Sequence, residues 1–337
     1  MPQRLIVLFI ALLLMHSVAK GAETDPLPTL LATKVVSSID QQEQPIRYWA
    51  PAIAKQHPRP LLILLHTWSS DYTQDRSEWQ VEAVKRDWVY VQPNFRGRND
   101  HPEACGSRLA RQDILDALDW AKQEFRIDES RIYLAGVSGG GHMTMLMAGY
   151  HPDRFSAASA WVGISNLEDW YRFHAPNGKV GNYAKMIAAC CGGAPGSSTT
   201  VDAQYRERSP IHHIGKGVNL PLDLNSGVKD GKTGSVPIHQ TLRAYNVLAV
   251  AQQLPTVPEA IIDQLWRDGK LAHPLPEDIA PDVTYPCDIL LRRTAGVTRV
   301  TIFDGSHQAH PAAAAAWLAR QSRPTKSPER QPLPSAD

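Results

Sequence analysis

The sequence predicts an α/β fold in which a mainly parallel central sheet carries helices on both faces. Segments of strand length alternate with segments of helical period over residues 61–163. Residues 61–65 and 88–92 are largely apolar throughout, which is typical of strands buried on both faces of a parallel sheet. This alternation indicates right-handed crossovers between neighbouring strands.

Composition sets the size of the domain and the class of partner. The chain has 337 residues, with 35 Lys and Arg against 34 Asp and Glu. This balance provides no strong field for nucleic acid or for an anionic membrane surface, so we expect neither partner. Residues 23–320 are enough for one large domain with a full core. The tail, residues 321–337, is rich in Pro, Ser, Arg and Lys and is predicted to be disordered.

Residues 1–22 are predicted to be a secretory signal peptide. Arg4 precedes an apolar run over residues 5–15, which is shorter than the roughly 20 residues that span a bilayer. Small residues follow, and cleavage is expected after Ala19 or Ala22. A membrane anchor or a buried first helix is the alternative, which no second apolar span supports. We therefore expect a secreted or periplasmic protein that is free of the membrane after cleavage.

The remaining elements are expected in order along the chain. Edge strands are predicted at 34–38 and 46–49, and further strands at 61–65, 88–92, 132–135, 155–163, 220–224 and 297–303. Helices are predicted at 79–86, 109–125, from 143, 166–173, 238–252 and 312–319. Two segments rich in Gly or Pro, 174–213 and 255–285, are expected to be irregular apart from a short helix at 260–266. Long segments of this kind are usually functional, so they are candidates for shaping the substrate site.

A G-x-S-x-G motif at residues 136–140 stands between a predicted strand and a predicted helix. A strand that turns at once into a helix places Ser138 at a strained corner, with its hydroxyl projecting into a site. The amide of Gly139 would lie at the helix N-terminus, where N–H groups are unpaired and negative charge is favoured. A plain glycine-rich turn is the alternative, but the strand before and the helix after favour a nucleophile with an oxyanion donor beside it.

An acid and a base follow the serine along the chain. A serine hydroxyl needs a base to take its proton, and the base needs a carboxylate to orient it. Asp230 lies in a Gly-rich loop after the strand at 220–224, and His307 lies in a turn after the last strand. All three residues thus fall at the C-terminal ends of strands, where parallel sheets place their sites. The sequence predicts Ser138 as nucleophile, His307 as general base and then acid, and Asp230 as orienting acid.

Each partner of Ser138 has a rival. Asp223 lies inside a predicted strand, Asp304 lies three residues before the histidine, and His310 lies at a predicted helix start. A loop that follows a strand reaches an imidazole more readily, which favours Asp230 and His307. Three other histidines are expected to be structural: His142, His212 and His213.

A second oxyanion donor is expected from the loop after the strand at 61–65. The backbone N–H of Trp68 or of Thr67 is the candidate. The alternative for Trp68 is that its ring packs over the mouth of the site, and the two roles are compatible because they use different atoms.

The cysteine pattern gives no sign of a metal site or another cofactor. The four cysteines include no C-x-x-C spacing and no Cys/His cluster, so no metal is predicted. In an exported protein, Cys105 is expected to pair with Cys190 or Cys191, with buried free thiols as the alternative. The adjacent pair Arg292 and Arg293 would bind a substrate carboxylate or, as is more common, be solvated.

Residues 131–143, R-I-Y-L-A-G-V-S-G-G-G-H-M, resemble the catalytic domain of the prolyl oligopeptidase family. Asp128 before them, H-P-D-R-F at 151–155 and W-V-G-I-S-N-L at 161–167 extend the resemblance to about residues 61–318. Val236-Pro237 after Asp230 matches the acid loop of the family, and His307 matches its final histidine. The resemblance implies an α/β-hydrolase fold and a serine hydrolase with a Ser-Asp-His triad.

Two departures from the family bear on the substrate. Only residues 23–60 precede the first core strand, so we expect no N-terminal propeller of the kind that filters substrates in the oligopeptidases. The usual His-Gly is replaced by His66-Thr67, and residues 231–235 lengthen the acid loop. The same core also resembles secreted carbohydrate esterases of the acetylxylan and feruloyl types.

The expected function is thus that of a secreted serine hydrolase that cleaves an amide or ester bond in a small molecule or a short peptide. A carbohydrate esterase is the first alternative. A non-catalytic binding protein on a hydrolase scaffold is the second.

Overall fold

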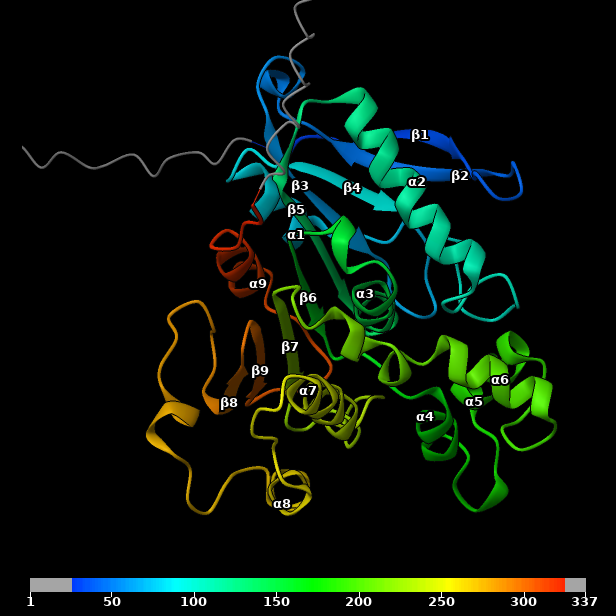
Figure 1. The fold of residues 1–337 in the computed structure, drawn as a ribbon, viewed down its shortest axis with the longest axis vertical. Coiled ribbons are helices and arrows are strands. Elements are labelled where there is room, and N and C mark those ends of the chain that lie inside the picture. Colours follow the sequence, from blue (N-terminus) through cyan, green and yellow to red (C-terminus); the bar gives the residue numbers. More distant parts are fainter. Residues whose placement is uncertain (1–25, 325–337) are drawn as a thin grey trace, which may run out of the picture.

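The computed structural model describes residues 26–324, which fold around a nine-stranded sheet (Figure 1). The strand order is β1-β2-β4-β3-β5-β6-β7-β9-β8. The strands are β1 (Leu31–Val36), β2 (Glu43–Trp49), β3 (Arg59–Leu65), β4 (Val89–Pro93), β5 (Ile127–Val137), β6 (Ala157–Trp161), β7 (Leu222–Gly227), β8 (Ile289–Ala295) and β9 (Thr298–Phe303). Neighbours from β4 to β9 run parallel, whereas β1, β2 and β8 pair antiparallel at the two edges. The predicted fold class is confirmed.

Helices cover both faces of the sheet. They are α1 (Ser77–Val84), α2 (Arg108–Glu124), α3 (Gly139–Tyr150), α4 (Leu167–Phe173), α5 (Asn182–Cys191), α6 (Thr199–Arg208), α7 (His239–Ala251), α8 (Glu259–Asp268) and α9 (Pro311–Leu318). The apolar side chains of α2, α3 and α7 pack on one face, and those of α1 and α9 pack on the other. Successive residues of β3 alternate between the two cores: Leu61, Ile63 and Leu65 join the first, and Leu62 and Leu64 join the second. This alternation explains why an unbroken apolar run forms a strand here.

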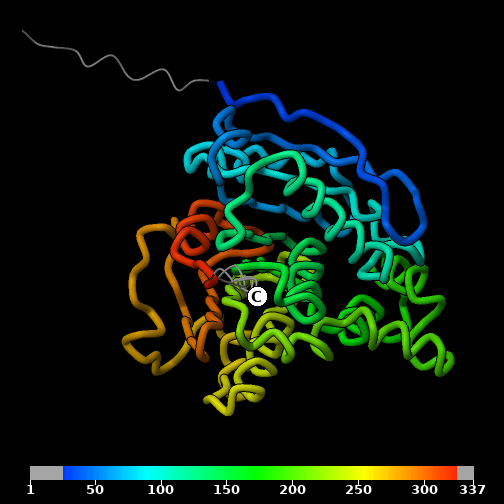
Figure 2. The backbone as a smooth tube through the Cα atoms, turned by 45° about the horizontal axis from the view of Figure 1, so that its top comes forward, coloured from blue at the N-terminus to red at the C-terminus, as the bar shows by residue number. Residues whose placement is uncertain are grey.

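Residues 174–213, predicted to be irregular, contain α5 and α6, so that prediction is wrong. The apolar side chains of α5 recur at helical spacing, with Met186, Ile187, Cys190 and Cys191 buried on one face. They pack with α4 and α6 into a satellite cluster separate from the two sheet cores. We define this satellite cluster by its members: Trp68, Cys105, Ile164, Leu167, Trp170, Met186, Ile187, Cys190, Cys191, Val201, Tyr205 and Val236. Figure 2 shows residues 166–213, in green, and residues 270–288, in orange, on opposite sides of the molecule.

The edge strand β8 was not predicted from the sequence. It contains Arg292 and Arg293, whose charge masks the alternation of a strand. The structure pairs them with Asp282 and Asp278 at 3.0 and 2.8 Å, so each forms an ion pair within the domain, while the Arg293 side chain remains 31% exposed. Ion pairing at a sheet edge lets charged residues occupy a strand position there.

The expected disulfide is absent, because the four cysteines are free thiols. Cys105 and Cys190 nevertheless lie together in the satellite cluster, where burial and a mutual hydrogen bond raise the pKa of the Cys105 thiol.

Gln321 and Arg323, at the start of the predicted tail, contact β5 through Tyr133 and Ser130. The predicted signal peptide and residues 325–337 lie outside the described residues. Within residues 26–324, no helix has both the length and the apolarity needed to cross a bilayer.

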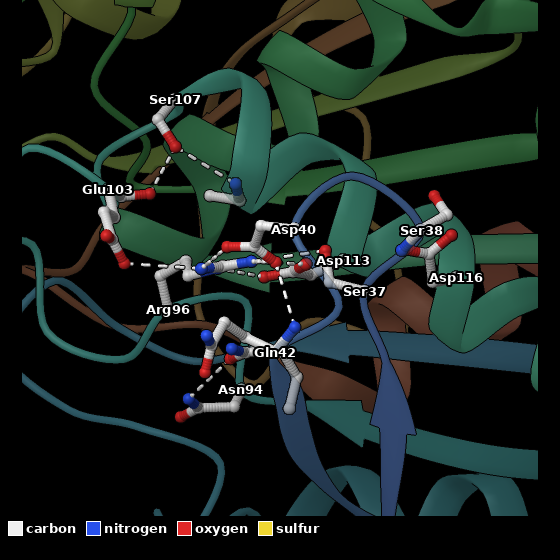
Figure 3. Close-up of polar contacts among 12 residues, drawn as sticks. Ser37, Ser38, Asp40, Gln42, Asn94, Arg96, Glu103, Ser107, Asp113 and Asp116 are labelled. Carbon is white, nitrogen blue, oxygen red and sulfur yellow. Dashed lines mark hydrogen bonds and ion pairs between the residues drawn. The ribbon is translucent and has the colours of Figure 1, made fainter.

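Arg96 ties the N-terminal hairpin to the body of the domain (Figure 3). Its side chain is 3% exposed and pairs with Asp113 of α2 at 2.6 Å and with Asp40, in the turn between β1 and β2, at 2.7 Å. The hydrogen bond from Arg96 lowers the pKa of Asp40 to about 2. Phe95 and Arg96 both have positive φ, 34° and 75°, which is uncommon for residues with side chains. The ion pairs therefore stabilise a strained loop at the C-terminal end of β4.

Replacing Arg96 with alanine is expected to reduce the free energy of unfolding by about 3–5 kcal/mol. The substitution leaves Asp113, whose side chain is 1% exposed, as a buried charge without its partner. Arg98→Ala is the matched control, because Arg98 is 55% exposed and its ion pair with Asp100 lies on the surface, so its loss costs about 0–1 kcal/mol. Urea unfolding of the two variants measures the difference, and equal losses would show that the Arg96 network adds no stability.

Candidate active site

Ser138 stands at a sharp turn between β5 and α3. Its φ and ψ are 58° and −116°, a conformation that side chains rarely adopt. The neighbouring glycines allow the turn, because a Cβ on Gly136 would lie 2.3 Å from the Gly140 backbone, and one on Gly140 would lie 2.3 Å from the Leu65 oxygen. The amide of Ser138 donates to Trp161 of β6 at 2.8 Å, which fixes the corner against the sheet. The strand and helix predicted around the motif are both present.

Asp230 and His307 meet at the ends of β7 and β9. Oδ2 of the fully buried Asp230 lies 2.8 Å from Nδ1 of His307. The other oxygen, Oδ1, accepts hydrogen bonds from the amides of Gly231 at 2.8 Å and Val236 at 3.0 Å. Three donors thus hold one carboxylate, which keeps it oriented and offsets the cost of burying its charge. His307 itself remains 26% exposed.

One cavity of about 390 Å³ joins Ser138 and His307. Its remaining wall comes from the loop after β3, the start of α1, the end of β5, α5 and the turn that carries His307. The lining residues are Thr67, Trp68, Ser69, Arg76, Glu78, Val137, Ser138, Tyr183, His307, Gln308 and Ala309. Two larger cavities, of about 520 and 550 Å³, are lined by residues 245–294 and 279–290 and contain neither Ser138 nor His307. The structure therefore brings the predicted nucleophile and base together at one opening.

The two candidate amides of the loop after β3 differ in what they bind. The N–H of Thr67 donates to Gln74 Oε1 at 3.0 Å, so it is already engaged. The N–H of Trp68 has no acceptor among residues 26–324. It also lies beside the elbow, since a Cβ on Gly139 would stand 2.4 Å from the Trp68 nitrogen. Of the two, the geometry favours Trp68 as a partner to the Gly139 amide.

Neighbouring side chains fix the position of Trp68. Its carbonyl accepts from the amide of Asn99 at 2.9 Å, and its ring meets Trp170 edge-on with centroids 4.7 Å apart. The ring is 1% exposed and belongs to the satellite cluster, so it lies under the site and does not cover its mouth. His66, just before this loop, stacks on Phe95 at 3.9 Å, and burial lowers its pKa.

The rival acids and bases have other partners. Asp223 is buried inside β7 and pairs with Arg299 at 2.8 Å. Asp304 pairs with Lys229 at 2.6 Å on the surface. His310 lies 3.5 Å from the Cys287 sulfur beside α9.

The histidines expected to be structural also have local contacts. Nε2 of His142 faces the Arg208 carbonyl at 2.7 Å, and burial lowers the His142 pKa to about 4. His213 lies 3.1 Å from the Tyr150 hydroxyl.

Several residues of the site were not predicted from the sequence, among them Tyr183, Arg76 and Gly234. Tyr183 lies on α5, where a helical period of buried residues was present but overlooked. Arg76 lies in a polar loop with no recognisable pattern. Gly234 lies in the lengthened acid loop, and a Cβ there would stand 2.2 Å from Asp230 Oδ1 and 2.6 Å from His307 Cβ.

The strand order and the elbow after β5 define the fold as that of the α/β-hydrolases. Solved structures share it: acylaminoacyl peptidase of Pyrococcus horikoshii aligns with 86% of this chain and 40% of its own, at a TM-score of 0.56 and 20% identity. Fluorophosphonate-binding serine hydrolase F of Staphylococcus aureus aligns with 87% of this chain and 98% of its own, at a TM-score of 0.54 and 17% identity. At these identities the likeness is one of fold.

The sequence comparison identifies the family. Residues 75–257, more than half of the chain, match the prolyl oligopeptidase family, and the chain belongs to it. The chain is therefore a hydrolase, peptidase-like or esterase, and the resemblance drawn from its motifs is confirmed.

The individual relatives include both enzymes named as peptidases and enzymes named as esterases. The chain is 31% identical to the acylamino-acid-releasing enzyme of Arabidopsis thaliana over 41% of its own length and 18% of the relative's. It is 43% identical to dipeptidyl-peptidase 5 of Porphyromonas gingivalis over 28% of its own length and 15% of the relative's. It is 29% identical to acetylxylan esterase A of Emericella nidulans over 25% of its own length and 32% of the relative's. The chain thus spans less than a third of the length of each of these relatives.

Replacing Gly234 with alanine is expected to lower kcat/KM for an activated ester by roughly 100-fold, the scale of a misplacement near 1 Å. The added methyl overlaps both Asp230 and His307, so their 2.8 Å hydrogen bond cannot keep its geometry. Gly215→Ala serves as control, because its Cβ would make ordinary contacts of 3.4 and 3.6 Å. Steady-state kinetics on samples of matched circular dichroism decide the outcome. Equal rates in the two variants would mean that the acid loop does not constrain the pair.

Proposed function

We propose that the protein hydrolyses an acyl bond through Ser138, His307 and Asp230, by way of an acyl-enzyme. The observation that carries this proposal is the 2.8 Å contact between His307 Nδ1 and Asp230 Oδ2, with His307 and Ser138 on the wall of one cavity. In this arrangement the base is oriented by a buried acid and faces the same space as the nucleophile.

In the first half of the reaction, Ser138 Oγ attacks the carbonyl carbon of the substrate while Nε2 of His307 takes the hydroxyl proton. Asp230 stabilises the imidazolium that forms and holds Nδ1–H in place. Among the described residues, Ser138 has no hydrogen bond to His307, and such bonds commonly tighten only when substrate binds. The imidazolium then gives its proton to the leaving group as the tetrahedral intermediate collapses.

The negative oxygen of that intermediate would lie between the amides of Gly139 and Trp68. The first amide of α3 has no acceptor within the helix, and the adjacent Trp68 amide is also free among residues 26–324. Preorganised donors of this kind stabilise developing charge, and each contributes about 3 kcal/mol to the transition state in related chemistry. Thr67 has no part in this arrangement, because its amide binds Gln74.

In the second half, water replaces the leaving group. His307 removes a proton from water, the resulting hydroxide attacks the ester of Ser138, and the same two amides hold the oxygen. Proton return from His307 to Ser138 Oγ then releases the acid. Every proton taken is given back within one cycle.

The scissile bond is proposed to be an amide or an ester of a small molecule or short peptide, with family membership favouring a peptidase. The specific alternative is a carbohydrate esterase, which the likeness to acetylxylan esterases favours. The signal peptide expected at residues 1–22 would export this activity from the cytoplasm.

A fluorophosphonate probe is expected to label the wild type but not Ser138→Ala, and the same substitution should reduce ester turnover by roughly a million-fold. Ser130→Ala is the control, because Ser130 lies at the other end of β5 and bonds to Asp128. Equal labelling of the two variants would refute the proposed nucleophile. Amino-acid anilides and acetylated xylose assayed beside simple esters then separate peptidase from esterase, since only a peptidase cleaves the anilides.

A further inference from the structure

Arg76 lies on the wall of the cavity that contains Ser138 and His307. It directly precedes α1, in the loop that follows β3 and Trp68. Its side chain is 13% exposed, so most of the side chain is withdrawn from water. The cavity thus has a fixed positive charge beside the proposed nucleophile.

This guanidinium has no hydrogen bond among residues 26–324. Its Nε is enclosed without a partner. The nearest carboxylate, Glu78, lies 3.7 Å from Nη1, beyond hydrogen-bond distance, and Glu78 is itself 58% exposed. Burial lowers the pKa of Arg76, with only partial compensation from Glu78.

Other buried arginines of the described chain are bonded. Each of the four arginines whose residues are less than a tenth exposed has at least one hydrogen bond to a carboxylate or a carbonyl: Arg96, Arg111, Arg208 and Arg299. Arg76 is somewhat more exposed than these four and has no such bond; Arg59 also has an enclosed Nε without a partner, but only Arg76 of the two lies on the wall of the proposed active site. A charge that is largely removed from water and has no hydrogen-bonded partner is costly, and this one lies on a cavity wall, which points to a partner from outside the chain.

We propose that Arg76 binds a carboxylate of the substrate, so that the preferred substrates are acyl compounds with an anionic group close to the scissile carbonyl. The planar guanidinium fits a carboxylate through two parallel hydrogen bonds, and the low exposure of the site strengthens them. Glu78 competes weakly for Arg76 and can turn to solvent when the substrate arrives. This inference rests on the proposed function and adds a substrate class to it.

Matched pairs of substrates test the proposal on each side of the bond. On the acyl side, 4-nitrophenyl hydrogen glutarate is compared with 4-nitrophenyl pentanoate. On the leaving-group side, N-acetylalanyl-phenylalanine is compared with its C-terminal amide. The wild type should prefer the anionic member of one pair by 10-fold or more in kcat/KM, and equal rates within both pairs would overturn the proposal without any variant.

The variant Arg76→Gln should reduce that preference by roughly 10- to 100-fold, as expected for the loss of charge-assisted hydrogen bonds. Arg76→Lys should keep part of the preference, because it keeps the charge but loses the planar fork. Glu78→Gln should keep or increase it, because the competing carboxylate is gone. A preference that survives in Arg76→Gln, or that is lost equally in Glu78→Gln, would show that Arg76 is not the binding group.

The neutral substrates separate this inference from the proposed function. Arg76→Gln should remain labelled by a fluorophosphonate at Ser138, and the ratio of its anionic to its neutral kcat/KM, not its absolute rate, is compared with that of the wild type. A wild type that is labelled and that hydrolyses the neutral esters, but shows no preference for the anionic substrates, would refute the carboxylate site alone. Absence of labelling in the wild type would refute the proposed function itself.

Discussion

Gly139, the first residue of α3, lies so close to the backbone of Trp68 that no side chain fits at its position. A Cβ on Gly139 would stand 2.4 Å from the Trp68 nitrogen, and a Cβ on Gly140 would stand 2.3 Å from the Leu65 oxygen. Two amides can face one substrate oxygen only if the loop after β3 and the elbow after β5 approach at backbone distance. The parallel pairing of β3 with β5, which aligns Leu65 with Gly136, brings those two ends together. The site thus depends on a contact between main chains.

Distant parts of the chain support that contact. The amide of Asn99 holds the Trp68 carbonyl, and Phe95 stacks on His66 immediately before the loop. Arg96 fixes the loop that carries these residues through its ion pairs to the N-terminal hairpin and α2. On the other side, the Trp68 ring packs against α4 and α5 in the satellite cluster. One tryptophan therefore connects the proposed oxyanion donor to the helices that border the substrate.

The strands and site residues that could be predicted from the sequence are those that a local residue pattern determines. A strand buried on both faces must be apolar throughout, so β3 and β4 were recognisable, and a serine corner needs glycines on both sides, so the elbow was too. The pairing of Asp230 with His307 followed from chain order and strand ends. The partner of the Thr67 amide was not predictable, because Gln74 reaches back to it from a later turn. Arg76 gave no signal either, since a lone arginine in a polar loop becomes notable only when its lack of partners is seen in three dimensions.

The most direct test of the account is a crystal structure of the protein after reaction with a fluorophosphonate. The phosphorus should be bonded to Ser138 Oγ, with its oxygen about 2.7–3.1 Å from both the Trp68 and Gly139 nitrogens, the distances expected of oxyanion donors. His307 should remain bonded to Asp230. A phosphonyl oxygen that points away from the Trp68 amide, or that binds Thr67 after displacement of Gln74, would contradict the arrangement proposed here.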